Sequence, residues 1–158
     1  MTTVVTATAT LWLTGGLTFY GGDFVGQGLA CGGQYVPEQE EWVAMPIEWF
    51  MKGYISCGDV AHVRFRDGTT WEGPVLDSGC LLHYEIFDTG LPFVGDFPVY
   101  LRQRLGPVPT GTGQIAVWRK QQGRWWDVPP LDAWGTKWCH GPLTMPRPRN
   151  PRWTERNL

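Results

Sequence analysis

Glycine and proline interrupt this chain so often that it cannot form long helices. Its 158 residues include 21 Gly and 13 Pro, which divide it into short apolar runs separated by turns. The run from Val60 to Phe65 alternates like a strand, with Val63 and Phe65 on the inward face. Asp67-Gly68 follows as a hairpin signal. The pattern predicts an all-β domain built from short strands.

Two more strands are expected at the start of the chain. Residues 4–13 alternate Thr with apolar side chains, which is typical of a strand with one wet face. We expect Gly15-Gly16 to end this strand and residues 17–20 to begin a second one. The glycine-rich stretch 21–33 then predicts a loop whose backbone is free to lie close to a barrel rim or a ligand.

The rest of the chain predicts one short helix, a last barrel strand and an extension. Residues 46–52 form the helix, with Pro46 at its first position. Residues 97–101 form the last strand, which Arg102 to Arg104 continue. Residues 106–140 predict a Trp-rich two-stranded β-ribbon, because two short strand patterns flank residues 120–123. Residues 141–158 are a Pro/Arg-rich extended arm that cannot bury a core alone.

The charges of the chain are unevenly distributed. Residues 1–100 hold 12 acidic and 3 basic residues, whereas residues 101–158 hold 3 acidic and 10 basic ones. This asymmetry predicts that the basic tail docks on the acidic part of the same chain or of a neighbouring copy. No stacking platform lies between the arginines of residues 147–152, so we expect no nucleic-acid partner. No apolar run is long enough for a membrane-spanning helix.

Two aspartates follow apolar runs and precede turn residues. Val75-Leu76 predicts the end of a buried strand, which places Asp77 where the chain leaves the core at Ser78-Gly79. Asp88 follows Ile86-Phe87 in the same way. A partly desolvated carboxyl has a raised pKa, as a general acid near neutral pH requires. In the alternative interpretation, each aspartate is a turn residue whose side chain only accepts hydrogen bonds from backbone amides.

The four cysteines predict disulfides rather than a metal site. Cys31, Cys57, Cys80 and Cys139 form no CxxC pair, and their wide spacing argues against zinc, so neither a metal nor another cofactor is expected. Two disulfides are compatible with an oxidising compartment. No secretory signal is visible in the first residues. Either a signal was removed, or the protein leaves its cell by another route such as lysis.

Several short motifs point, by their order, to one family group. They are Thr18-Phe19-Tyr20-Gly21-Gly22, Ala30-Cys31-Gly32, Ser56-Cys57-Gly58, His83-Tyr84-Glu85-Ile86-Phe87-Asp88, and Asp77 followed eleven residues later by Asp88. Together they resemble the six-stranded double-psi β-barrel group, which includes expansins, barwin-like domains, lytic transglycosylases of rare-lipoprotein-A type and the three-Asp domain. The resemblance covers about residues 17–101. It implies a barrel over residues 1–105, strand 4–13 included, followed by the ribbon and the arm.

The resemblance also implies a site and disulfide pairs. Asp77 would protonate a glycosidic oxygen or grip a sugar hydroxyl, with Asp88 assisting. Thr18 and Tyr20 would line the groove. The further glycan-contacting candidates are Trp71, His83 and Tyr84. Cys31 would pair with Cys57, and Cys80 with Cys139.

Two functions follow from these expectations. The first is binding or cleavage of a cell-wall glycan such as peptidoglycan, by a lytic-transglycosylase-like or a non-hydrolytic expansin-like protein facing the cell wall. The second is a non-catalytic structural subunit, for example of a phage virion or tail, whose C-terminal arm contacts further copies. Carboxyls sharing one open groove would support the first function. Carboxyls far apart, or an Asp77 held by main-chain amides under a covering loop, would remove the sugar-handling role built on Asp77 and make an inert scaffold the better interpretation.

Overall fold

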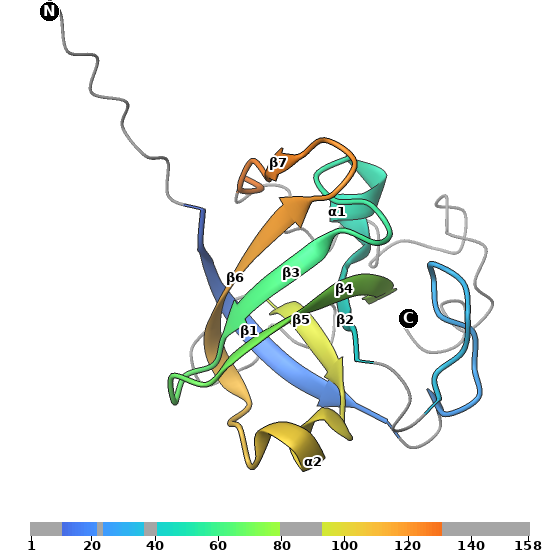
Figure 1. The fold of residues 1–158 in the computed structure, drawn as a ribbon, viewed down its shortest axis with the longest axis vertical. Coiled ribbons are helices and arrows are strands. Elements are labelled where there is room, and N and C mark those ends of the chain that lie inside the picture. Colours follow the sequence, from blue (N-terminus) through green and yellow to red (C-terminus); the bar gives the residue numbers. More distant parts are fainter. Residues whose placement is uncertain (1–10, 22–23, 37–40, 80–92, 131–158) are drawn as a thin grey trace, which may run out of the picture.

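The computed structural model describes residues 11–21, 24–36, 41–79 and 93–130. Most of the predicted strand 4–13 and all of the arm 141–158 therefore lie outside the described residues. The elements, shown in Figure 1, are β1 (Leu13–Tyr20), β2 (Val43–Pro46), α1 (Ile47–Met51), β3 (Val60–Arg64), β4 (Thr70–Gly79), β5 (Phe93–Pro98), α2 (Leu101–Leu105), β6 (Gly111–Arg119) and β7 (Arg124–Trp125).

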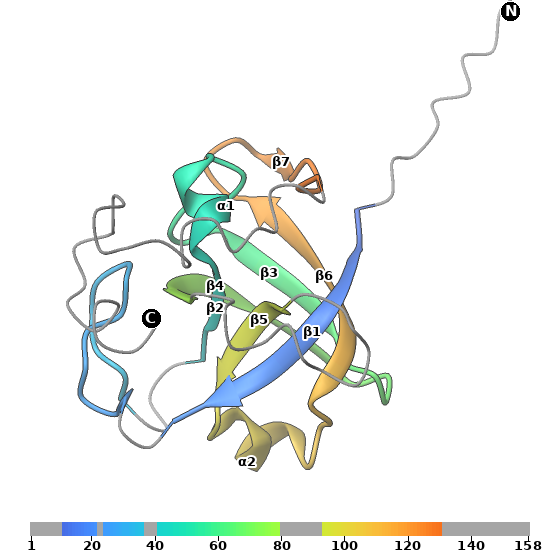
Figure 2. The same ribbon diagram turned by 180° about the vertical axis from the view of Figure 1, so that it is seen from behind.

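Six of the strands close into a barrel. Their order is β1-β5-β2-β4-β3-β6, and β6 pairs back with β1, while β7 extends β6. The pairs β1–β5 and β2–β4 are parallel, and the other pairs are antiparallel. Figure 2 shows the same barrel from behind, with α1 and β7 at one end and α2 at the other. The chain is thus an all-β, six-stranded double-psi β-barrel, as the resemblance implied.

The last barrel strand lies in the region predicted to be a separate ribbon. The hairpin around residues 120–123 forms, and Trp118 pairs with Trp125 across it. However, β6 also pairs with β3 and β1 along most of its length. Barrel pairing therefore continues to Trp118, beyond the predicted boundary at residue 105, because β1 and β3 would otherwise leave two open edges.

The side chains pack into two apolar clusters on opposite faces of the strands. The larger cluster fills the barrel and includes Leu17, Val43 and Phe97. Val63 and Phe65 also lie in it, which confirms their predicted inward orientation. The smaller cluster lies on the other face of β1 and β2 and consists of Tyr20, Leu29, Tyr35, Trp42, Ala44 and Tyr100. Alternation along each strand separates the two sets.

Two local predictions were wrong for tertiary reasons. Gly15-Gly16 does not end a strand but lies inside β1, opposite Gly113 and Thr112 of β6. The site is crowded, because a Cβ on Gly113 would lie 2.1 Å from Leu17 Cδ1, so glycine serves close strand packing there. Arg102 to Arg104 do not continue a strand but belong to α2, which follows β5 directly.

Other local predictions are confirmed. The helix predicted at residues 46–52 is present as α1, although Pro46 is its N-cap and the end of β2 rather than its first residue. The Asp67-Gly68 turn joins β3 to β4, and Gly68 has a φ of 89° that favours glycine.

Candidate functional site

Two aspartates and a threonine lie in one row across four neighbouring strands. Thr18 of β1 pairs in register with Asp96 of β5, Asp96 with Ala44 of β2, and Ala44 with Asp77 of β4. Residues directly opposite one another in a sheet point to the same face. We call these four residues the acid row. Only the small Ala44 side chain separates the two carboxyls, whose Cα atoms lie roughly 10 Å apart by strand spacing.

Asp96 is the acid that the sequence interpretation missed. Its residue is 8% exposed, and the Thr18 hydroxyl donates a 2.8 Å hydrogen bond to its Oδ1. Burial raises the pKa of Asp96 from its ordinary value of 3.8 to about 7, against the lowering effect of hydrogen bonds from Thr18 and the Phe97 amide. The carboxyl therefore takes up a proton near neutral pH. An acid inside the apolar run 93–98 was the only signal in the sequence.

Asp77 is more enclosed than the sequence predicted. Strand β4 continues to Gly79, so Asp77 lies inside a strand rather than at a turn. The residue is 0% exposed. The Tyr20 hydroxyl donates to Asp77 Oδ2 at 2.7 Å, and the Ala30 amide donates to Oδ1 at 2.8 Å. Asp77 thus holds a main-chain amide under a covering loop, which is the arrangement that favours a structural role.

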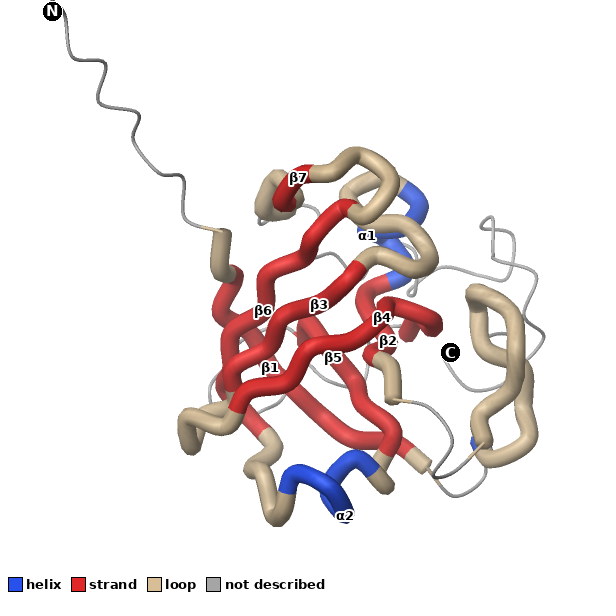
Figure 3. The backbone as a smooth tube through the Cα atoms, in the orientation of Figure 1, coloured by secondary structure: helices blue, strands red, loops and turns tan. Residues whose placement is uncertain are grey.

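The covering loop, residues 24–36, is tied to the barrel at several points. Figure 3 shows it beside β4 and β2. The predicted disulfide between Cys31 and Cys57 is present, and the Cys31 amide donates to the Leu76 carbonyl at 2.9 Å. The Tyr35 hydroxyl donates to the Tyr20 carbonyl at 2.7 Å. These bonds hold the loop over the Asp77 end of the acid row.

An aromatic network supports the acid row from below the loop. The Trp42 indole N–H donates to the Tyr20 hydroxyl at 2.7 Å, and that hydroxyl in turn donates to Asp77. The Tyr35 ring packs edge-on against both Tyr20 and Trp42, with ring centroids 5.3 and 4.9 Å away. Such a polar chain inside an apolar cluster fixes the orientation of each side chain.

The structure brings some of the predicted site residues together and places others elsewhere. Thr18 and Tyr20 meet the two buried acids, as described above. Trp71 is 4% exposed and packs edge-on against Phe97 in the core, so its ring is not an open sugar platform. The predicted residues Asp88, His83, Tyr84, Cys80 and Cys139 lie outside the described residues.

The described part of the chain carries neither a cluster of metal-ligating side chains nor a membrane-spanning helix. Its His, Cys, Asp and Glu side chains form no group of three or more that would hold a metal ion. None of its helices combines the length and the apolar character needed to cross a bilayer.

Comparison with known proteins yields structural likeness only. No protein-family profile matches the sequence, and no curated protein is significantly similar to it. Among solved structures, the chain is similar to the apo form of an expansin from Clavibacter michiganensis. The TM-score is 0.46 and the identity 19%, over 68% of this chain and 50% of the expansin. The chain therefore matches about half the length of that protein.

Proposed function

We propose that this protein binds a cell-wall glycan of peptidoglycan type through the face of the barrel that carries the acid row, without hydrolysing it. The observation that supports this proposal is the Asp96–Thr18 pair. Asp96 keeps some solvent contact, and its pKa of about 7 gives it a proton to donate to a sugar oxygen near neutral pH.

Binding without hydrolysis is favoured because the two carboxyls differ in access. Hydrolysis of a glycosidic bond ordinarily needs two carboxyl groups that flank the bond. Asp77 has no exposed surface and is held by Tyr20 and Ala30, so a sugar between the carboxyls would have to displace the covering loop. One protonated carboxyl with a neighbouring hydroxyl suits hydrogen bonding to a glycan chain.

The Cys31–Cys57 disulfide supports a location outside the reducing cytosol. We therefore propose that the protein works extracellularly, at the cell wall, or as part of a virion. Both settings would bring the barrel into contact with wall polymers.

A sedimentation assay tests the glycan proposal. The full chain is incubated with insoluble peptidoglycan, chitin or cellulose, and the bound fraction is measured beside that of Asp96→Asn. Asp127→Asn is the matched control, because Asp127 is 79% exposed and pairs only with Arg124 among the described residues. We expect retention of the unmodified chain on peptidoglycan and several-fold weaker retention of Asp96→Asn alone.

The soluble products of the same incubation separate binding from cleavage. New reducing ends that depend on Asp96 would show hydrolysis, and anhydro-sugar ends that depend on it would show lytic cleavage; either product would contradict binding without cleavage. Absence of retention on all three polymers would overturn glycan binding itself.

A structural subunit is the second candidate, and the enclosure of Asp77 favours it. The Asp77 carboxylate accepts hydrogen bonds from the Ala30 amide of the covering loop and from the Tyr20 hydroxyl. In this case residues 141–158 would contact a neighbouring copy. This interpretation is tested by deleting residues 141–158 and measuring the mass of the oligomer in solution. An unchanged oligomer mass would show that the arm does not hold the copies together.

A further inference from the structure

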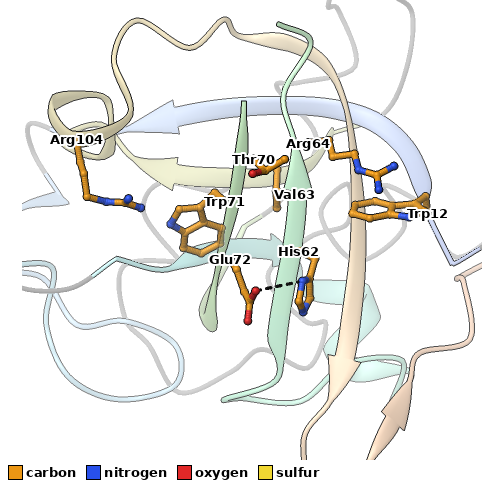
Figure 4. A pocket seen from close by; sticks show the side chains of 8 residues that line it. All are labelled: Trp12, His62, Val63, Arg64, Thr70, Trp71, Glu72 and Arg104. Atoms are coloured by element: carbon orange, nitrogen blue, oxygen red, sulfur yellow. Dashed lines mark ion pairs between the residues drawn. The ribbon is translucent and has the colours of Figure 1, made fainter. Parts of the chain in front are cut away.

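A second candidate site lies on the barrel away from the acid row. A hollow of about 430 Å³ opens over β3 and the Thr70–Glu72 end of β4, several residues from Asp77. Its polar and aromatic lining includes Trp12, His62, Arg64, Thr70, Glu72 and Arg104. Figure 4 shows Arg64 against Trp12 at one end and Arg104 near Trp71 at the other. The volume is in the range of small-molecule sites.

Most charges around the hollow already have partners. His62 Nδ1 lies 3.5 Å from Glu72 Oε2. Arg104 forms a two-pronged ion pair with Glu41, which also accepts a 2.9 Å hydrogen bond from the Trp71 indole. These contacts leave neither Glu72 nor Arg104 as an isolated charge.

Arg64 is different. Its guanidinium carbon lies 3.9 Å from the centre of the Trp12 ring, and the residue is exposed. Within residues 11–21, 24–36, 41–79 and 93–130, no acceptor or carboxylate engages this guanidinium. A guanidinium stacked on an indole is held in one plane while its N–H donors stay available. Two neighbouring N–H groups of a guanidinium can donate one hydrogen bond to each oxygen of a carboxylate.

The charge of the hollow indicates which anion it suits. Among the described residues, Arg64 supplies one positive charge without an acidic partner, and the Glu72 carboxylate lies on the same lining. A monoanion balances that single charge, whereas a dianion such as a phosphate monoester would be repelled by Glu72. Thr70 and His62 add hydrogen-bonding groups for hydroxyls, and Trp12 adds apolar surface for a ring.

We propose that this hollow binds a carboxylate-bearing sugar, with Arg64 as the anion-binding residue and Trp12 as its support. The inference rests on the proposed glycan function and narrows its ligand: the protein selects acidic wall glycans over neutral ones. The acid row and the hollow then contact different parts of the polymer.

The test compares two sugars that differ by one lactyl ether group, which carries the carboxylate. The full chain is titrated with N-acetylmuramic acid and with N-acetylglucosamine, and binding is followed by NMR at the Trp12 indole N–H and the Arg64 Nε–H. We expect the acidic sugar to bind about tenfold more tightly, the effect of one charge-assisted pair of hydrogen bonds. Arg64→Gln should abolish this preference.

Arg66→Gln is the matched control, because Arg66 is an exposed arginine in the turn of the same β3–β4 hairpin and does not line the hollow. It should leave the preference unchanged. Equal affinity for the two sugars, or a preference that survives Arg64→Gln, would overturn the inference. Tighter binding of N-acetylglucosamine 6-phosphate than of the carboxylate sugar would overturn the assignment to a monoanion.

The two proposals fail in distinguishable ways. If the chain is retained on peptidoglycan but does not discriminate the sugars, glycan binding stands and the hollow is not the acidic subsite. If it discriminates the sugars through Arg64 but is retained on no polymer, the hollow is a carboxylate-sugar site and the wall-binding function is wrong.

Discussion

Thr18 and Asp96 face one another across the parallel strands β1 and β5, and the threonine hydroxyl donates a 2.8 Å hydrogen bond to the carboxyl. The contact joins residues 78 positions apart in the chain. It connects the start of the barrel to the strand that precedes α2 and places a titratable group in the wall of the barrel. The pH dependence of the fold follows from it.

The first prediction concerns pH and stability. Burial raises the folded-state pKa of Asp96 from 3.8 to about 7. The folded state therefore holds this proton more tightly than the unfolded state. The resulting stabilisation is complete below about pH 4 and is lost as pH rises through 7, with a total of about 4 kcal/mol.

Urea unfolding at pH 4.5, 6 and 8 measures this dependence. Asp96→Asn, which stays uncharged, should show a flatter profile and exceed the unmodified chain in stability at pH 8. The exposed variant Asp127→Asn should keep the original slope. Parallel profiles for all three proteins would show that Asp96 titrates normally.

The second prediction concerns the Tyr20 hydroxyl. Tyr20→Phe removes the acceptor of the Trp42 indole N–H and a donor to the Asp77 carboxylate. Both partners are buried, so we expect the free energy of unfolding to fall by about 2–3 kcal/mol. Tyr54→Phe changes the same atom at a partly exposed residue and should cost less than about 0.5 kcal/mol. Equal effects in urea melts would contradict the proposed polar chain.

The third prediction concerns a buried ion pair at the end of the barrel near α1. Arg119 Nε lies 2.8 Å from Asp59 Oδ2, with side-chain exposures of 9% and 3%. Arg119 also donates to the carbonyls of Gly53 and Tyr54 at 3.0 and 2.7 Å. Arg119→Met leaves the Asp59 charge buried without its cation and should lower the free energy of unfolding by about 3–5 kcal/mol.

Arg124→Met provides the comparison for this pair. Arg124 lies nearby in β7, but its pair with Asp127 is exposed and should contribute no more than about 1 kcal/mol. Thermal melts of the two variants should therefore differ clearly. A loss of the same size in both would show that burial does not strengthen the Arg119–Asp59 pair.

The fourth prediction concerns the Cys31–Cys57 disulfide. The bond closes a loop with a sequence separation of 26, so the double variant Cys31→Ala/Cys57→Ala should lose about 3–4 kcal/mol of stability. The covering loop should also exchange its amide hydrogens faster, since the disulfide anchors it beside β4. Hydrogen exchange at Ala30, whose amide donates to Asp77, reports this opening. Unchanged protection there would mean that the hydrogen bonds alone hold the loop.

The features that sequence alone determined are local ones. The Asp67-Gly68 turn, the alternating strand β3 and the short helix after Pro46 each depend on the conformational preferences of a few adjacent residues. Short motifs in the right order also led, by resemblance, to the barrel and to the pairing of Cys31 with Cys57.

Tertiary structure decided the features that depend on distant partners. Asp96 and Asp77 lie in one row only because β2 pairs with both of their strands, whereas spacing along the chain pointed to Asp88 instead. Gly15-Gly16 continues a strand because it pairs with Thr112 and Gly113 of β6, about a hundred residues away along the chain. The exposure of a carboxyl sets its pKa, and exposure depends on the side chains that pack around it. Only the folded barrel determines that packing.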